Sequence, residues 1–147
     1  GFVGICNQDF DLQQHLGNAT GSVGGYNEAA AGIWALAGQA SSVTGTGGSV
    51  WALRAAATLA ASNVANDRMM FALNRATGKC WVGKNGTWLN SGDPAAGTNE
   101  WINGIPTTDS VYIAASIYTG TTNTWRIQAK AGEFGYSPPS GFTAWGS

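Results

Sequence analysis

Side chains that could carry acid–base or nucleophilic chemistry are few in this sequence and lie far apart. The single histidine is His15, and a Ser-His-Asp site would have to use it. No Gly-x-Ser-x-Gly motif marks a nucleophilic serine, and neither Cys6 nor Cys80 lies in an electropositive segment. Eight acidic residues are spread along the chain, and no two stand out as the acid and base of a glycosidase. We therefore expect a protein without catalytic residues, in which His15 is an ordinary surface or loop histidine.

Residues that could bind a metal ion are equally sparse. Asp9 and Asp11 form an Asp-x-Asp pair, but calcium takes roughly six to eight oxygen ligands, and the longer spacing of an EF-hand is missing. One histidine and two distant cysteines do not make a zinc site. The sequence predicts neither a metal site nor a cofactor, and it places Asp9 and Asp11 in a solvated loop.

Tryptophan is the residue type that points to binding, because seven occur in 147 residues. Trp88 and Trp101 flank the polar stretch 90–99, NSGDPAAGTN, in which Asp93 precedes Pro94 and is expected to cap a turn. Exposed aromatic rings beside amide and carboxylate groups suit stacking on a sugar or a hot spot for a protein partner. The alternative is that both rings cover an edge of the fold or pack against a neighbouring subunit. The candidate ligand-binding residues are Trp88, Asn90, Asp93, Asn99 and Trp101, with the loops at 8–15 and 44–48 as further contact regions.

Composition and charge exclude several classes of partner. The chain has 147 residues, so we expect one domain over residues 1–147. Charged residues make up only 10%, and the seven basic residues are scattered singly, which argues against nucleic-acid binding. No apolar run is long enough to cross a bilayer, so membrane insertion is not expected. With only two cysteines, two buried thiols are favoured over a disulfide bridge.

Short strands separated by turns dominate the rest of the sequence, which favours an all-β sandwich or barrel. Turns are expected at Thr77-Gly78 and at the Asn-Gly pair of residues 85–86, which readily takes positive φ. The alanine-rich stretch 51–61 is predicted to follow a strand at about 49–55, with a short helix as the alternative. The other predicted strands are 2–6, 68–74, 79–83, 111–118 and a short one that begins at 88.

The segment 124–130 shows the cleanest alternation in the chain. Polar residues occupy its even positions and apolar residues its odd positions, which is typical of a strand with one wet and one buried face. A turn at 120–123 separates it from the strand at 111–118, so the two are predicted to form a hairpin. The wet face would hold Thr124, Arg126, Gln128 and Lys130, and the buried face Trp125, Ile127 and Ala129.

Five motifs along the chain resemble a known family. They are GFVGI at 1–5, TGK at 77–79, WVGKNGTW at 81–88, NSGDPAAGTN at 90–99 and FGYSPPSGF at 134–142. In this order they resemble the SPRY (B30.2-like) domain. The resemblance implies a concanavalin A-like antiparallel β-sandwich. It also implies a domain that binds proteins or glycans through loops on one side and is not catalytic.

The stretch 90–99 is similar to a loop of SPRY-like domains in bacteriophage structural proteins. This similarity implies a non-enzymatic module located in the virion, such as a fibre, decoration or receptor-binding component. Its expected partners are other virion proteins or copies of itself, and a host surface protein or glycan. Two alternatives remain open: a purely structural assembly subunit, and a carbohydrate-active enzyme on a sandwich fold.

The start of the chain departs from the family pattern. A SPRY domain has several strands before the segment that matches residues 1–5, and this sequence begins at that point. We therefore expect a sandwich that lacks its first strands and is part of a longer chain or an assembly. If neighbouring chains complete it, an open sheet edge is expected near residues 2–6.

Overall fold

The computed structural model describes residues 2–7, 29–34, 40–44, 52–53, 66–105, 107–108, 110–116, 124 and 126–145. Side chains are described for Ile5 and for residues 66–105, 107–108, 110–113, 124 and 126–145. Within these ranges the chain forms β-strands and one 3-10 helix, η1. The elements are β1 (Phe2–Asn7), β2 (Ala29–Trp34), β3 (Ala40–Thr44), β4 (Ala52–Leu53), β5 (Met69–Asn74), β6 (Lys79–Lys84), β7 (Thr87–Trp88), β8 (Ile102–Asn103), β9 (Val111–Ser116) and η1 (Ala131–Glu133).

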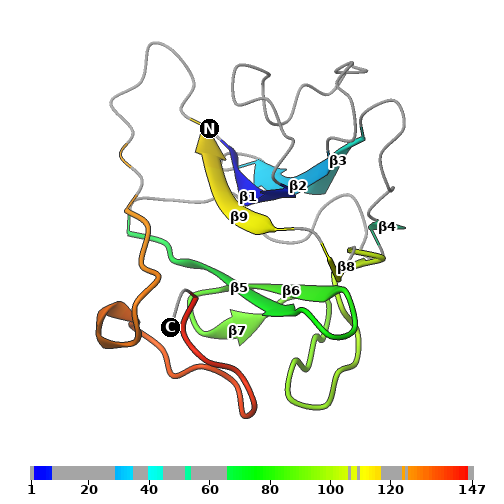
Figure 1. Ribbon diagram of the computed structural model, residues 1–147. Coiled ribbons are helices and arrows are strands. Elements are labelled where there is room, and N and C mark those ends of the chain that lie inside the picture. Colours follow the sequence, from blue (N-terminus) through cyan, green and yellow to red (C-terminus); the bar gives the residue numbers. More distant parts are fainter. Residues whose placement is uncertain are drawn as a thin grey trace.

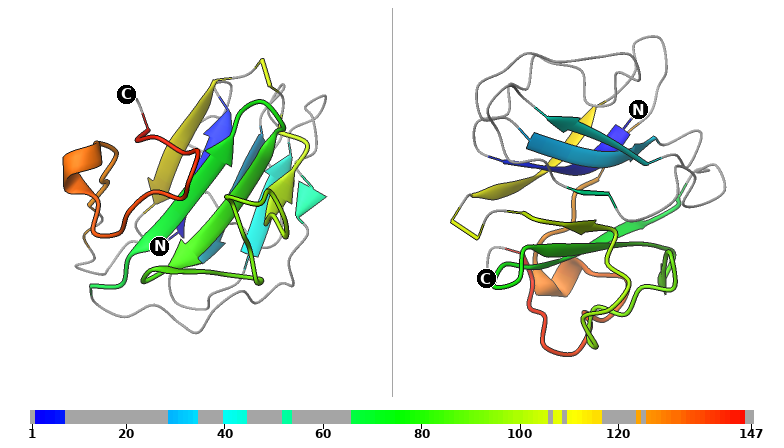
Figure 2. Two further views of the ribbon diagram at one scale, coloured as in Figure 1. Left: turned by 90° about the horizontal axis from the view of Figure 1, so that it is seen from below. Right: turned by 90° about the vertical axis from the view of Figure 1, so that its right-hand side faces the viewer.

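The strands form two antiparallel sheets, which confirms the predicted all-β class (Figure 1). The first sheet has the order β3-β2-β1-β9, and the second has the order β4-β8-β6-β5, with β7 paired to β6. The sheets lie one above the other, as both views of Figure 2 show. Strands β3 and β4 contact each other across the two sheets, so β9 and β5 end the sheets on the opposite side.

Local sequence signals located strands β5 and β6 of the second sheet correctly. The predicted strands at 68–74 and 79–83 are β5 and β6, which pair from Met69 opposite Lys84 to Asn74 opposite Lys79. The Asn-Gly turn at 85–86 has φ values of 51° and 87°, which places both residues in the left-handed region that the tight hairpin requires. Strand β4 lies within the strand predicted at about 49–55, whereas β2, β3 and β8 were not predicted.

The prediction of an open edge near residues 2–6 is wrong. Strand β1 is central, because it pairs with β2 on one side and with β9 on the other. The first sheet instead ends in β3 and β9. Any strand added to this sheet would have to pair with one of those two.

The predicted hairpin between 111–118 and 124–130 is also not found among the described residues. Strand β9 pairs with β1, and residues 124 and 126–130 are not in a strand. Ile127, which alternation placed on a buried face, is 54% exposed. Residues 117–118 and Trp125 lie outside the described residues.

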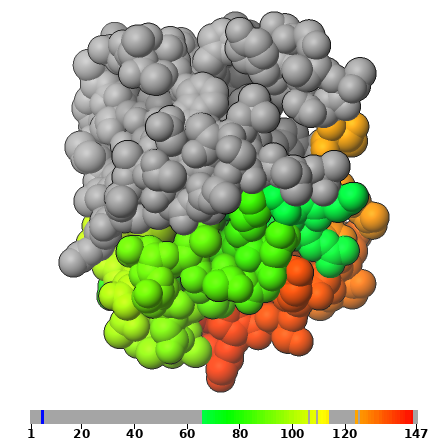
Figure 3. All heavy atoms as spheres, turned by 180° about the vertical axis from the view of Figure 1, so that it is seen from behind, coloured from blue at the N-terminus to red at the C-terminus, as the bar shows by residue number. Residues whose placement is uncertain are grey.

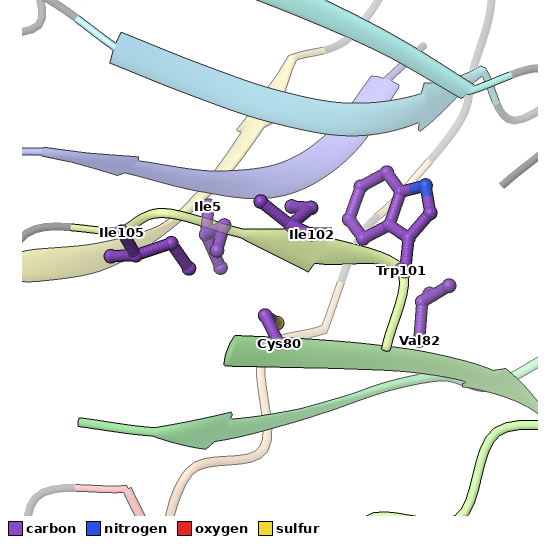
Figure 4. Close-up of a cluster of buried hydrophobic side chains, with 6 residues drawn as sticks. All are labelled: Ile5, Cys80, Val82, Trp101, Ile102 and Ile105. Carbon is purple, nitrogen blue, oxygen red and sulfur yellow. The ribbon is translucent and has the colours of Figure 1, made fainter. Parts of the chain in front are cut away.

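A cluster of buried side chains joins the two sheets. Ile5 of β1 reaches down to side chains of β6 and β8 and of the residues that flank β8 (Figure 4). Cys80 in this cluster is a buried free thiol, as predicted, while the Cys6 side chain lies outside the described residues. The buried members are Ile5, Cys80, Val82, Trp101, Ile102 and Ile105, and each is at most 2% exposed.

Strand β6 is buried on both faces. Cys80 and Val82 face the cluster between the sheets, so the alternation of the strand turns Trp81 to the other face. There the Trp81 ring meets Phe142 edge-on, with 6.0 Å between ring centroids. The C-terminal segment, residues 134–145, therefore forms a further layer against the second sheet, and its Trp145 packs against the core cluster.

Candidate functional site

The loop between β7 and β8, residues 89–100, contains the polar stretch that the sequence singled out. Its centre is a small hairpin, in which Asp93 and Thr98 exchange two backbone hydrogen bonds of 3.0 and 3.1 Å. The Asp93 carboxylate accepts a hydrogen bond of 3.0 Å from the Ala96 N–H, so it caps the turn as predicted. The loop lies at the surface beside the strands of the second sheet (yellow-green beside green in Figure 3).

Side chains from β6 hold this loop in place. The indole Nε1 of Trp81 donates a 2.7 Å hydrogen bond to the carbonyl oxygen of Thr98. The Lys79 ammonium donates a 3.0 Å bond to the carbonyl oxygen of Gly97 and lies 3.5 Å from the carboxylate of Glu100. Glu100 is only 6% exposed, whereas the Lys79 side chain is 32% exposed, so the ion pair joins a buried carboxylate to a partly solvated cation at the base of the loop. The loop is thus fixed to a strand that is itself buried on both faces.

Backbone strain is concentrated on the exposed side of the same loop. Asn90, Ser91 and Asn99 have φ values of 57°, 52° and 52°, in the left-handed region that disfavours most side chains. The Asn99 side-chain amide donates a 3.0 Å hydrogen bond to the Ser91 carbonyl oxygen, which ties the two strained positions together. Strained backbone persists only where its surroundings determine it, and it is enriched at functional sites.

The candidate residues predicted from the sequence divide into two groups. Asn90, Asp93 and Asn99 are exposed on the loop, and Trp88 is half-buried at its start. Asp93 and Asn99 use part of their polar groups to shape the loop, whereas no such bond is described for Asn90. Three of these four residues therefore lie exposed on the loop, and the fourth, Trp88, directly precedes it.

Trp101 does not belong to this surface, which corrects the prediction. It is 1% exposed and its ring packs 6.4 Å from that of Phe71 within the core cluster. The backbone N–H of Trp101 bonds to the Cys80 carbonyl oxygen, so the residue enters β8 beside β6 and its ring lies between the sheets. Among the described residues, no acceptor lies within hydrogen-bond distance of its indole N–H. The ring cannot stack on an external ligand in this position.

Sequence reasoning missed a second polar cluster, at the turn of residues 84–87. The Asn85 side chain accepts a bond of 2.8 Å from the Arg68 N–H and donates one of 2.7 Å to Asp67, and the latter is paired with Lys84 at 2.8 Å. Tyr136 lies over this turn, and the centroid of its ring is 6.0 Å from the Arg68 guanidinium carbon. The ring also packs against Gly86, where a Cβ would lie 2.8 Å from Tyr136 Cε1. The Lys-Asn-Gly motif predicted the turn but not that the C-terminal segment covers it.

The described carboxylates are all engaged in contacts that hold the fold. Asp67 is paired with Lys84, Asp93 caps its turn, and Glu100 is paired with Lys79. The Glu133 carboxylate accepts bonds from the N–H groups of Ala129 and Lys130. The described part of the chain contains no group of three or more potential metal ligands, and Asp9, Asp11 and His15 lie outside it.

Comparison with family models, with curated proteins and with solved structures finds no match for this chain. Among the described residues, no helix has the length and apolar character needed to cross a membrane.

Proposed function

We propose that this chain is a non-enzymatic recognition module that contacts a protein or a glycan through the 89–100 loop. The proposal is based on two features of this one loop. Its exposed side contains residues with a strained backbone, and its inner side is held in place by side chains of β6. Asn90, Ser91 and Asn99 are exposed at positive φ, while Trp81 and Lys79 hold the loop from below. Loops fixed on a rigid scaffold are common sites of binding.

A loop that is shaped before binding lowers the entropic cost of association. Ordering one rotamer-rich side chain at an interface costs roughly 0.5–1.5 kcal/mol, and ordering backbone adds to this. The hydrogen bonds within the loop and from β6 supply that order in the free protein. We infer that the loop binds by fitting a partner to an existing surface.

The chemistry of the loop surface favours an uncharged partner. Its exposed residues are mainly amides, hydroxyls and alanines, and Asp93 is its one exposed charged residue. Amide and hydroxyl groups match sugar hydroxyls and peptide groups in hydrogen-bonding capacity. The half-buried Trp88 ring at the start of the loop adds an aromatic surface for a sugar ring or an apolar side chain.

We further propose that the fold is a concanavalin A-like β-sandwich of the SPRY type and that the module belongs to a virus particle. The two antiparallel sheets with a shared core support the sandwich. The resemblance of residues 90–99 to a loop of SPRY-like domains in bacteriophage structural proteins supports the assignment to a virus particle. Partners are then other virion proteins, copies of this chain, or a protein or glycan on the host surface.

The test is a binding screen against bacterial surface polysaccharides and purified virion proteins, with two matched variants. Ala95→Arg places a large cation on the exposed turn of the loop, whereas Ala131→Arg places the same side chain on the exposed η1. We expect the loop variant to weaken the strongest interaction at least about tenfold, which is about 1.4 kcal/mol. Equal binding by the two variants would exclude the loop as the recognition surface.

A second candidate function is that of an assembly subunit without an external ligand. Strand β9 at the end of the first sheet favours this candidate, because an uncharged edge strand is a natural site for pairing with another chain. No comparable observation favours an enzyme, since each described carboxylate is engaged in a contact within the fold.

A further inference from the structure

Strand β9 has an outer edge to which another strand could be added. It is the last strand of the first sheet, and in the described part of the chain no strand pairs with its outer edge. Its sequence, VYIAAS, contains no charged residue or proline, which are the residues that usually protect an edge. Tyr112, at its second position, is 52% exposed. The edge is therefore open to pairing as far as the described residues show.

The 124–130 segment has the properties of a strand donor. Its polar and apolar residues alternate as in a half-buried strand, yet its described residues form no strand. Ile127 is 54% exposed, although alternation assigns it to a buried face. A segment with a strand-like alternation and an exposed Ile127 thus occurs in one chain with an edge strand that has no described partner on its outer side.

The two elements are complementary in the pattern of their faces. On β9, Val111 packs towards the core cluster while Tyr112 faces outward. An added antiparallel strand can place Ile127 on the side of Val111 and keep Arg126 and Gln128 on the side of Tyr112. This register extends the apolar face of the sheet, whereas a shift by one residue reverses both faces.

We propose that the 124–130 segment of one copy of this chain pairs with β9 of a second copy, and that the exchange is reciprocal. Each copy contributes one donor and one acceptor, so a two-fold dimer satisfies both. This interface is independent of the 89–100 loop and of the partner proposed for it. Strand addition supplies affinity through backbone hydrogen bonds and specificity through the alternating side chains.

A second copy is favoured over the segment's own β9 by the placement of the residues that follow it. Tyr136 lies over Arg68 and Gly86, and Phe142 lies against Trp81, so the C-terminal segment is held on the second sheet. In this arrangement residues 124 and 126–130 form no strand, and Ile127 is exposed. Donor and acceptor are thus presented together on a single molecule.

Sedimentation analysis over a wide range of protein concentration tests the proposal. We expect a concentration-dependent dimer that Ile127→Lys weakens at least about tenfold, since the substitution puts a charge where the dimer would bury an apolar side chain. Thr124→Lys is the matched control, because it adds the same charge on the wet face, and we expect less than about a threefold effect. Both positions are exposed in the single chain, so neither variant should impair folding. A chain that stays monomeric at all concentrations, or a dimer indifferent to Ile127→Lys, would overturn the proposal.

Cross-linking shows which copy supplies the strand. Two differently tagged chains, one with Tyr112→Cys and one with Gln128→Cys, are mixed and treated with a short bismaleimide in a Cys6→Ser background. Cys80 is buried and should not react. We expect a cross-linked heterodimer. A chain that carries both substitutions and cross-links only within itself would show that the segment closes its own sheet, and the proposal would be wrong.

Discussion

The indole Nε1 of Trp81 donates a 2.7 Å hydrogen bond to the carbonyl oxygen of Thr98, and this bond joins a buried strand to an exposed loop. The same oxygen accepts a 3.0 Å bond from the Asp93 N–H, so one atom closes the loop hairpin and anchors it. Gly92 leaves room for the ring, because a Cβ at that position would lie 3.0 Å from Trp81 Cδ1. The shape of the 89–100 loop therefore depends on the position of Trp81.

Trp81→Phe removes this hydrogen bond and keeps an aromatic ring in the same position, so it should loosen the loop. We expect Trp81→Phe to lower the free energy of unfolding by about 1–2 kcal/mol, from the lost bond and the smaller ring. Amide hydrogen exchange at residues 96–99 should rise by more than the global change. Trp88→Phe, at the half-buried start of the loop, is the control. Equal exchange at residues 96–99 in the two variants would contradict this role of Trp81.

The ion pair at the base of the loop should contribute more to the free energy of unfolding than an ion pair on the surface does. In Lys79→Met the buried Glu100 carboxylate loses a cation 3.5 Å away, and the Gly97 carbonyl loses its donor. We expect a loss of about 2 kcal/mol of stability in urea denaturation, and partial recovery when Glu100→Gln is added. Lys130→Met, at an exposed position, should change stability by less than about 0.5 kcal/mol. Similar losses of stability in Lys79→Met and Lys130→Met would show that the Lys79–Glu100 pair does not stabilise the fold more than an exposed lysine does.

Among the glycines whose surroundings the structure describes, Gly78 combines a positive φ with a close backbone neighbour, so its replacement should be costly. The φ of Gly78 is +64°, and a Cβ at this position would overlap the carbonyl oxygen of Ile105. The backbone of Ile105 is held close to Gly78, because the Ile105 N–H donates a hydrogen bond to the Gly78 carbonyl oxygen. We expect Gly78→Ala to reduce stability by about 2–3 kcal/mol. Gly132→Ala is the matched control, because nothing lies within 4 Å of its Cβ position. Thermal unfolding of the two variants measures the difference, and similar midpoints would contradict the predicted close approach.

Burial raises the pKa of the Cys80 thiol well above its usual range. The folded thiol keeps its proton when the unfolded thiol loses it, so this contribution to stability is complete below the unfolded pKa of about 8.5 and falls as pH rises above it. Above the unfolded pKa, this thiol alone should lower the free energy of unfolding by about 1.4 kcal/mol per pH unit. Urea denaturation at pH 8 to 10 should show a steeper decline for the wild type than for Cys80→Ala. Parallel declines, or rapid alkylation of Cys80 in the folded protein, would contradict its burial.

The sequence predicted correctly those strands and turns whose local residue pattern matches the structure that they adopt in the packed fold. Strands β5 and β6 follow from apolar residues between Gly-containing turns, and Asn85-Gly86 defines its own turn. Strands β2 and β3, AAAGIW and ASSVT, were missed because alanine, glycine and serine carry little strand propensity. Strand β2 takes its position from pairing with β1, which is a long-range contact, and β3 takes its position from pairing with β2.

The candidate site was predicted only in part for a similar reason. The loop residues Asn90, Asp93 and Asn99 are polar and lie on a surface loop, as their types suggest. Trp101 is close to them in sequence, but the backbone bond from its N–H to Cys80 places its ring between the sheets. Which way a tryptophan turns at a strand end depends on the partner strand, and sequence spacing does not contain that information.

The proposed recognition role requires that the 89–100 loop holds its shape in the absence of a partner. Backbone nitrogen-15 relaxation of the free protein measures this directly. We expect order parameters of about 0.85 for residues 90–99, equal to those of β5 and β6, because Trp81, Lys79 and Asn99 fix the loop. Order parameters below about 0.6 across the loop would show that it is mobile without a partner, and would contradict the claim.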